Sequence, residues 1–210
     1  MSLAIATFAE QRTVLHNISW QTFEVLLKET GEDRGSRFAY DDGILEIMAP
    51  LFEHESPKIN LDRFVFILAE ELKIEIKSAG SMTLKREDLR KGIEPDNCYY
   101  VQNEPVVRVR QQLDLANDPP PDLAIEIDIT SSSVNKLGIY SALGVRELWR
   151  YDGRVLMFYE LVEGSYVERE FSVAFGLVSC GDLGTFVEQS KAGGEMAVLK
   201  GFREWVRGKV

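Results

Sequence analysis

The sequence predicts one domain that mixes helices and strands, and three patterns point to this fold class. Residues 122–130 alternate strictly in polarity, with an acidic face and an aliphatic face, which is typical of a strand. Residues 56–77 carry apolar side chains at helical spacing. Residues 146–173 form strand-like stretches separated by turns that contain glycine. A length of 210 residues favours a single domain with a substantial core.

The N-terminal part is expected to contain an arm, a short helix, a hairpin and a long helix. Residues 1–18 show no clear period and predict a loose arm. Ser19 suits the N-cap of a helix that ends near Gly31. The Asp42-Gly43 pair predicts a tight turn between two strands in residues 37–48. The long helix is expected to begin at residue 56 or 57, because proline suits a first helical turn, and to end near residue 77.

The middle of the chain is expected to hold two strands, residues 81–85 and 96–102, with a basic cluster between them. Two interpretations of this cluster stay open: a solvated loop, or a rim that contacts phosphates beside an acidic site. Residues at strand spacing further along would extend such a rim. The cluster is Lys85, Arg86, Arg90 and Lys91, and its extension is Arg108 and Arg110.

The C-terminal half is expected to begin with the alternating strand and a helix. Ser131, Ser132 and Ser133 are good N-cap residues, so Lys136 is predicted about one turn into that helix, which ends at Gly144. Strands follow in residues 146–151, 155–162 and 166–173. Residues 180–188 fit neither pattern, and residues 195–207 predict a final helix. We therefore expect an arm (1–18), a main domain (19–190) and a C-terminal helical extension (191–210).

Composition argues against several classes of protein: those with a highly basic surface, those built on disulfides or structural zinc, and membrane or secreted proteins. A formal net charge of −10 argues against a surface coated with phosphate-binding charge, although it leaves room for a local basic rim. Cys98 and Cys180 form no CxxC pair, which predicts reduced thiols rather than a disulfide framework or structural zinc. The sequence has neither a membrane-length apolar run nor a signal-peptide pattern, so a cytoplasmic protein without a membrane partner is expected.

Acidic side chains and one amine converge on the alternating strand. Glu126 and Asp128 share its acidic face, and Lys136 follows close to the strand's end. Asp96 opens another strand; if the two strands are neighbours, Asp96 and Glu126 can ligate one divalent cation, for which magnesium is suited. Lys136 would orient or deprotonate the attacking water, or stabilise charge on phosphoryl oxygens. The alternative is an acidic face paired internally with Lys136 and arginines, without a metal.

These residues resemble the PD-(D/E)xK nuclease pattern, with the lysine moved from the strand to the following helix. The chain more specifically resembles the Uma2 family, a group of restriction-endonuclease-like proteins abundant in cyanobacteria. The matching stretches run in the family's order from Tyr40 to about Asp152. They are YDDGILEIMAP followed by His54, GIEPDNCYYV, PPDLAIEIDITSSS, and KLGIYSALGVRELWRYD.

The resemblance implies a restriction-endonuclease-like α/β (α+β) fold, with a mixed sheet flanked by helices and additional antiparallel strands. It implies Mg²⁺-dependent cleavage of DNA, with Mn²⁺ as an alternative ion, by Asp96, Glu126 and Lys136. His54 matches the family's histidine before the long helix, where a surface or capping role also fits. Nucleases of this kind that act on both strands of DNA are often homodimers.

Asp128 departs from the family, which usually has an aliphatic residue at this position. Asp128 would be either a further metal ligand or a charge that repels the scissile phosphate. The rival expectation is a catalytically degenerate nuclease fold that serves as a binding or assembly module. Aromatic residues late in the chain would then line a subunit contact or, alternatively, pack in the core. They are Trp149, Tyr151, Phe158, Tyr159 and Phe171.

Overall fold

A six-stranded mixed sheet forms the centre of the fold in the computed structural model, which describes residues 11–31, 34–50, 52–129 and 132–210, with only the backbone at 52–54. The strands are β4 (Lys77–Gly80), β7 (Asn97–Tyr100), β8 (Leu123–Ile127), β9 (Glu147–Tyr151), β10 (Leu156–Val162) and β11 (Ser165–Arg169). Their order is β11-β10-β9-β8-β7-β4. Strands β8 and β9 run parallel, and the other neighbouring pairs are antiparallel. This confirms the mixed sheet.

A second, antiparallel sheet has five strands in the order β1-β3-β2-β6-β5. They are β1 (Gln11–Leu15), β2 (Arg37–Asp41), β3 (Ile44–Ala49), β5 (Leu84–Arg86) and β6 (Lys91–Ile93). The expectation of a loose arm is wrong for residues 11–15, because β1 pairs with β3 along its length. Residues 1–10 of that expected arm lie outside the described residues.

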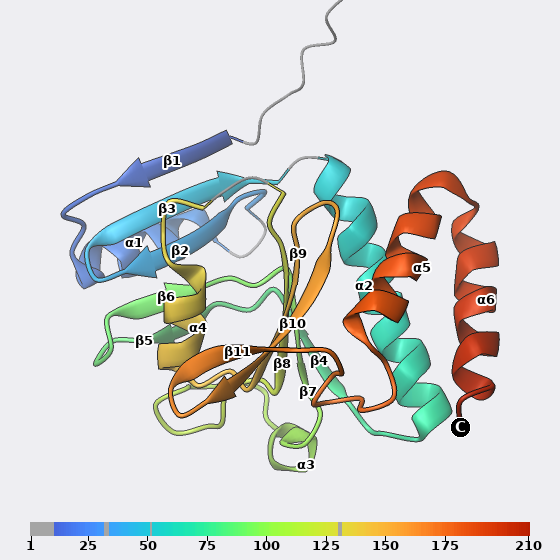
Figure 1. The fold of residues 1–210 in the computed structure, drawn as a ribbon. Coiled ribbons are helices and arrows are strands. Elements are labelled where there is room, and N and C mark those ends of the chain that lie inside the picture. The colour runs from blue at the N-terminus through green and yellow to red at the C-terminus, as the bar shows by residue number, and fades with distance from the viewer. Residues whose placement is uncertain (1–10, 32–33, 51, 130–131) are drawn as a thin grey trace, which may run out of the picture.

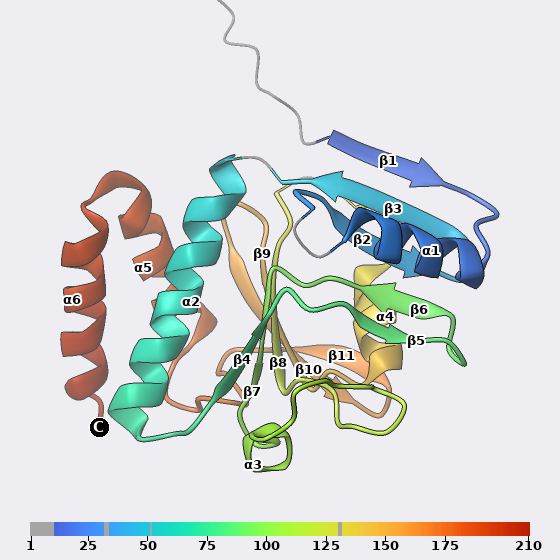
Figure 2. The ribbon, with the colours of Figure 1, turned by 180° about the vertical axis from the view of Figure 1, so that it is seen from behind.

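Helices lie on both faces of the six-stranded sheet, whereas the first helix, residues 20–30, packs on the second sheet (Figures 1 and 2). The helices are α1 (Trp20–Thr30), α2 (Phe52–Leu72), α3 (Glu104–Val107), α4 (Lys136–Leu143), α5 (Cys180–Ala192) and α6 (Glu195–Arg207). Leu123, Ile125 and Ile127 of β8 pack in a core shared with α2, α5 and α6. Ala124 packs in a second core with α4. The alternation of β8 therefore turns its aliphatic face to α2 and its acidic face towards α4.

Local signals confirm several element ends. The Ser19 hydroxyl accepts a hydrogen bond from the Thr22 amide at 3.1 Å and caps α1. Asp42 and Gly43 both have positive φ, 42° and 95°, as a tight turn between twisted strands requires. Gly144 ends α4 at a φ of 80°, which glycine adopts without steric penalty.

The long helix and the segment around Arg108 differ from expectation. Helix α2 begins at Phe52, before Pro57, and ends at Leu72, where Lys73 turns to a φ of 56°. His54 thus lies within the helix backbone rather than ahead of it. Arg108 is the C-cap of α3 and donates to Glu104 at 2.8 Å, so the predicted strand spacing of Arg108 and Arg110 is wrong. The start of α2 was predicted too late because proline is tolerated throughout the first turns of a helix and does not mark its first residue.

The remaining unassigned stretch and the late aromatic residues have structural roles. Residues 180–188 belong to α5, which Ser179 caps by accepting from the Asp182 amide at 3.0 Å. Trp149, Tyr151 and Phe158 are fully buried, so core packing accounts for them, whereas Phe171 is exposed. Among the described residues, no helix combines the length and the apolar character needed to cross a bilayer.

Candidate active site

Glu126 lies on β8 beneath the start of α4, and two side chains of that helix hold its carboxylate. The Lys136 ammonium donates to Glu126 Oε2 at 2.7 Å, and the Tyr140 hydroxyl donates to Glu126 Oε1. Lys136 and Tyr140 are four residues apart, so they lie on one face of the helix. Asn135 caps α4 by accepting from the Gly138 amide at 3.0 Å. Lys136 is therefore the first helical residue, and its predicted place one turn into the helix is wrong.

Asp96 precedes β7, the neighbour of β8, as the sequence pattern required for a shared site. Its amide donates to the Ile125 carbonyl at 3.1 Å, and its Oδ2 accepts from the Ile127 amide at 2.7 Å. These bonds connect Asp96 to the strand on both sides of Glu126. The two carboxylates are deeply buried, with 4% of Asp96 and 3% of Glu126 exposed.

The burial of these carboxylates sets their protonation. Burial raises the pKa of Asp96, against the opposing amide of Ile127 and the charges of Lys136, Lys58 and Arg37. Burial also raises the pKa of Glu126; Lys136 acts against this shift and the charge of Asp96 adds to it. Both pKa values stand above those of ordinary carboxylates because desolvation disfavours their charged forms. The pair would gain from a further cation.

Lys136 is a fixed positive charge in this arrangement. Burial lowers the pKa of Lys136, but the charges of Glu126 and Asp128 outweigh burial and raise the pKa to about 12. The ammonium is therefore protonated at neutral pH. This state suits the stabilisation of negative charge and does not suit the removal of a proton from water.

Asp128 lies on the same face of the β8 segment, yet arginines hold both of its oxygens. Arg12 of β1 donates to Oδ1 at 3.2 Å, and Arg150 of β9 donates to Oδ2 at 2.7 Å. Lys136 Nζ is 3.9 Å from Oδ1. These contacts favour an ion-pairing role for Asp128 over metal ligation, because its oxygen lone pairs are directed at two guanidinium groups.

Glu46 of β3 is a buried acid that links three segments around the site, and only 1% of it is exposed. Its Oε1 accepts from Arg12 at 2.7 Å and from the Ser132 hydroxyl at 2.8 Å, and its Oε2 accepts from the Ser133 amide at 2.7 Å. Ser132 and Ser133 thus bind the second sheet instead of capping α4. Thr130 and Ser131 lie outside the described residues. Glu46 fixes the loop that leads to Lys136.

The predicted basic cluster consists of ion-paired residues on the β5–β6 hairpin. Its four side chains pair with separate carboxylates: Lys85 with Glu24, Arg86 with Asp88, Arg90 with Asp42, and Lys91 with Asp41. These pairings favour the interpretation as a solvated hairpin over a free phosphate-binding rim. The side chain of His54 lies outside the described residues, so its proposed role stays a prediction.

A small cavity of about 160 Å³ opens onto the acidic face. Charged side chains of the acidic face line it together with residues of the loop before α4, of the start of α4 and of β9. They are Glu126, Asp128, Ser132, Val134, Asn135, Lys136, Leu137, Leu148 and Arg150. Among the described residues, no three His, Cys, Asp or Glu side chains gather in a group that could hold a metal ion. The donor chemistry of Asp96 and Glu126 nevertheless fits Mg²⁺, which binds one or two carboxylates and keeps several waters. The Lys136 ammonium on Glu126 already places one cation there.

Sequence reasoning missed Tyr140, Glu46, Arg12 and Arg150 as members of this site. The i, i+4 spacing from Lys136 was a usable signal for Tyr140. Arg150 is opposite Glu126 in the parallel β8–β9 register, and the positions of Arg12 and Glu46 depend on the β1–β3 pairing. No local pattern in the sequence predicts these registers.

Comparisons with known proteins found a matching family and a similar solved structure. The family model for Uma2, described as "Putative restriction endonuclease", matches residues 20–182. A crystal structure described as a "putative nuclease belonging to DUF820", from Anabaena variabilis ATCC 29413, is similar with a TM-score of 0.47 and 16% sequence identity. That similarity covers 71% of this chain and 90% of the other. No curated protein matches the chain.

Proposed function

The chain belongs to the Uma2 family, and from this premise we propose that it is a metal-dependent endonuclease that hydrolyses phosphodiester bonds in DNA. The observation that carries the proposal is the pairing of two buried carboxylates, Asp96 and Glu126, with the protonated Lys136. Acidic metal ligands and a nearby ammonium are groups that can stabilise the transition state of phosphoryl hydrolysis.

Each residue of the site has a role in the proposed reaction that follows from its chemistry. Asp96 and Glu126 would hold a divalent cation, with Mg²⁺ favoured and Mn²⁺ as an alternative. The bound cation would supply Lewis-acid stabilisation of the phosphoryl oxygens and a more acidic water. Lys136 would hold its proton and neutralise charge that develops on the phosphate, and Tyr140 would orient Glu126. In the overall reaction water adds to phosphorus, one P–O ester bond breaks, and a water proton ends on the leaving oxygen.

The decisive experiment follows supercoiled plasmid DNA incubated with the protein and Mg²⁺ or Mn²⁺. The parent should convert the plasmid to open-circular and linear forms, and Asp96→Asn should not. Asp88→Asn is the matched control, because it removes one carboxylate from an exposed pair with Arg86. Equal cleavage by parent and Asp96→Asn, or cleavage by neither, would refute the proposal.

A second candidate function is a catalytically degenerate module that binds a partner. It is favoured by the internal occupancy of the acidic face, where Lys136, Tyr140, Arg12 and Arg150 bond the oxygens of Glu126 and Asp128. Calorimetry separates the two functions. Uptake of Mg²⁺ or Mn²⁺ that disappears in Glu126→Gln supports the nuclease, whereas no uptake by the parent supports the module.

We also propose that the protein acts as a homodimer, since cutting both strands of a duplex calls for two sites of opposite orientation. Light scattering on the parent protein at micromolar concentration tests this. A monomeric mass with retained cleavage of both strands would contradict it.

A further inference from the structure

A large cavity separate from the acidic site lies between α1, the start of β2 and the edge strands of both sheets. Its volume is about 1050 Å³, at the upper end of typical ligand pockets. Strand β4 is an edge of the six-stranded sheet and β5 an edge of the other, so the cavity lies where the two sheets meet. We call it the basic cavity.

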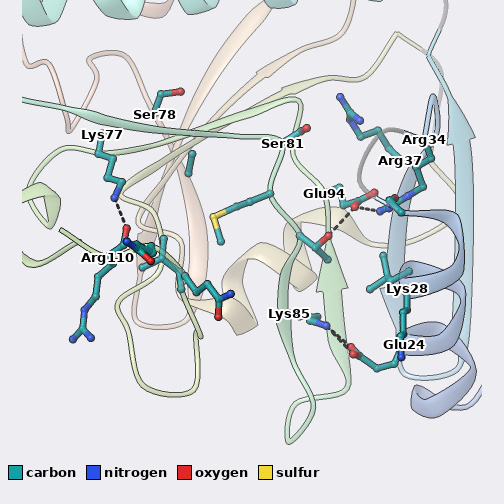
Figure 3. A pocket seen from close by; sticks show the side chains of 18 residues that line it. Glu24, Lys28, Arg34, Arg37, Lys77, Ser78, Ser81, Lys85, Glu94 and Arg110 are labelled. Carbon is teal, nitrogen blue, oxygen red and sulfur yellow. Dashed lines mark hydrogen bonds and ion pairs between the residues drawn. The ribbon is translucent and has the colours of Figure 1, made fainter. Parts of the chain in front are cut away.

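Positive charge dominates the lining of the basic cavity. Six cationic side chains line it, against the two carboxylates of Glu24 and Glu94, in a chain whose net charge is −10. Figure 3 shows Lys77 on one side and Lys28, Arg34 and Arg37 on the other. The six are Lys28, Arg34, Arg37, Lys77, Lys85 and Arg110. Such local concentration against the overall charge indicates a site for an anion.

Several of these cations lack a carboxylate partner. Glu94 pairs with Arg34, and Glu24 pairs with Lys85 at 2.7 Å, which accounts for both acids of the lining. Within the described part of the chain, no ion pair is formed by Lys28 or Arg37, and Arg37 Nε is buried without an acceptor. Lys77 donates to the backbone carbonyls of residues 107, 108 and 110 at 2.8, 3.3 and 2.9 Å. Arg110 pairs with Asp118 at 3.6 Å, outside the lining. The charges of Lys28, Arg37 and Lys77 are therefore the ones that no carboxylate among the described residues neutralises.

Arg37, which lines the basic cavity, lies at the end of β2 that faces the segment before Asp96. In the antiparallel β2–β6 register Ala39 is opposite Ile93, and the Glu94 amide donates to the Phe38 carbonyl at 3.0 Å. The same register brings Arg37 beside the turn into Asp96. A ligand in the basic cavity would thus extend from the neighbourhood of Asp96.

We propose that the basic cavity binds the phosphates of an unpaired nucleic-acid strand that leads away from Asp96. The nature of the ligand rests on the proposed nuclease function, whereas the affinity for phosphate rests on the unneutralised cations alone. A recess between two sheet edges admits a flexible single strand, whose sugars and bases can turn into it, more readily than a rigid duplex. Cationic grooves that follow the backbone are the usual means of binding single strands.

The test measures fluorescence anisotropy of a labelled 15-nucleotide single strand in EDTA, where no cleavage occurs. Lys28→Glu should weaken binding about fivefold at low salt. It should also reduce the slope of log affinity against log salt concentration by about 0.7, the value for one lost phosphate contact of a single strand. Lys200→Glu is the matched control, because it makes the same charge change on α6 at a side chain that is 78% exposed. Equal weakening by the two variants would overturn the proposal.

A second pair of variants and a competitor complete the experiment. Arg37→Gln should weaken binding of the same single strand several-fold more than Arg154→Gln does. Arg154 is an exposed control residue outside the cavity. Displacement of the strand by ATP as effectively as by unlabelled strand, at equal phosphate concentration, would assign the cavity to a free nucleotide instead. Tighter binding of the duplex of the same sequence would overturn the preference for an unpaired strand.

Failure of this inference and failure of the nuclease proposal give different results. If the parent cleaves plasmid but Lys28→Glu binds the strand as Lys200→Glu does, the cavity proposal falls and the nuclease stands. If Lys28→Glu weakens strand binding but the parent cleaves no plasmid with Mg²⁺ or Mn²⁺, phosphate binding stands and the nuclease proposal falls.

Discussion

Glu126 and Asp128 are two residues apart on one face of the β8 segment, yet their surroundings differ. Glu126 shares a single ammonium, that of Lys136, with the buried Asp96 nearby, and its other contact is the neutral hydroxyl of Tyr140. Asp128 has two guanidinium groups, Arg12 and Arg150, bonded to its oxygens. Glu126 therefore has one cationic side chain bonded to it, whereas Asp128 has two.

This difference separates a place for a cation from a structural ion pair. When both are ionised, the buried carboxylates of Asp96 and Glu126 have one ammonium in direct contact, that of Lys136 on Glu126, and their excess negative charge is costly in a poorly hydrated interior. A divalent ion would relieve that cost at Asp96 and Glu126. At Asp128 the same ion would have to displace arginines. We therefore divide the acidic face into a proposed reactive part, Asp96 and Glu126 with Lys136, and an anchoring part, Asp128 with its arginines. The following predictions test this division.

The largest effect is expected from removing the charge of Glu126. Glu126→Gln should lower the affinity for Mg²⁺ or Mn²⁺ at least about 100-fold. Loss of a residue that only holds a metal ligand in place already lowers metal affinity by up to about 100-fold, and loss of the ligand itself should lower it more. Isothermal titration calorimetry measures this. Asp128→Asn is the matched control on the same face and should retain most of the affinity. Equal losses in both variants would erase the difference between the two acids.

Lys136→Met should reduce the cleavage rate about 100- to 1,000-fold, as the loss of a group that stabilises transition-state charge does. Metal affinity should hold or rise, since the ammonium that occupies Glu126 Oε2 is gone. Single-turnover cleavage and calorimetry together measure the two quantities. Lys200→Met controls for the loss of one positive charge, and a fall in metal affinity in Lys136→Met would mean that the lysine supports the metal site instead.

Glu46→Ala should lower the free energy of unfolding by about 3 kcal/mol, because it leaves Arg12 without one buried charge partner and removes the acceptor of the Ser133 amide. Chemical denaturation measures the change. Glu168→Ala, in the exposed strand β11, is the control and should change stability little. A loss below about 1 kcal/mol would show that Glu46 does not anchor the loop before α4.

The reactive part of this face was predictable from local sequence, and the anchoring part was not. The period of two in β8 places Glu126 on the acidic face, and the proline before Asp96 marks a strand start, so the proximity of Asp96, Glu126 and Lys136 could be expected from the sequence. Arg12, Glu46 and Arg150 depend on strand registers between distant segments, which the chain does not encode as a local pattern. The sequence left the role of Asp128 open between a metal ligand and a charge that repels phosphate, because its arginine partners depend on the same registers. Burial raises the pKa of Glu126, Lys136 opposes this shift, and the charge of Asp96 adds to it.

The pH dependence of stability should report the excess negative charge at Asp96. Because burial raises the pKa of Asp96, the folded state binds its proton more tightly than the unfolded state. Parent stability in EDTA should therefore fall relative to Asp96→Asn as pH rises from about 3.8 through the raised pKa, with a slope approaching 1.4 kcal/mol per pH unit. Denaturation of both proteins across that range measures the difference. A difference independent of pH would show that Asp96 titrates normally.

The smallest effect on metal binding is expected from Asp128, where this chain departs from its family. Asp128→Asn and Asp128→Leu should each change the affinity for Mg²⁺ less than about threefold, since the arginines rather than a metal occupy the oxygens of this residue. Asp128→Leu should in addition lower the free energy of unfolding by about 2 kcal/mol, because Arg12 and Arg150 lose a buried acceptor.

Cleavage and DNA binding by the two Asp128 variants complete this comparison. If Asp128 only anchors, cleavage per folded molecule should stay near that of the parent. If Asp128 repels the scissile phosphate, both variants should bind DNA more tightly and cleave it faster. A loss of metal affinity close to that of Glu126→Gln would instead make Asp128 a ligand. In that case the arginines around it would have to move when the metal binds, and the two parts of the acidic face would be one site.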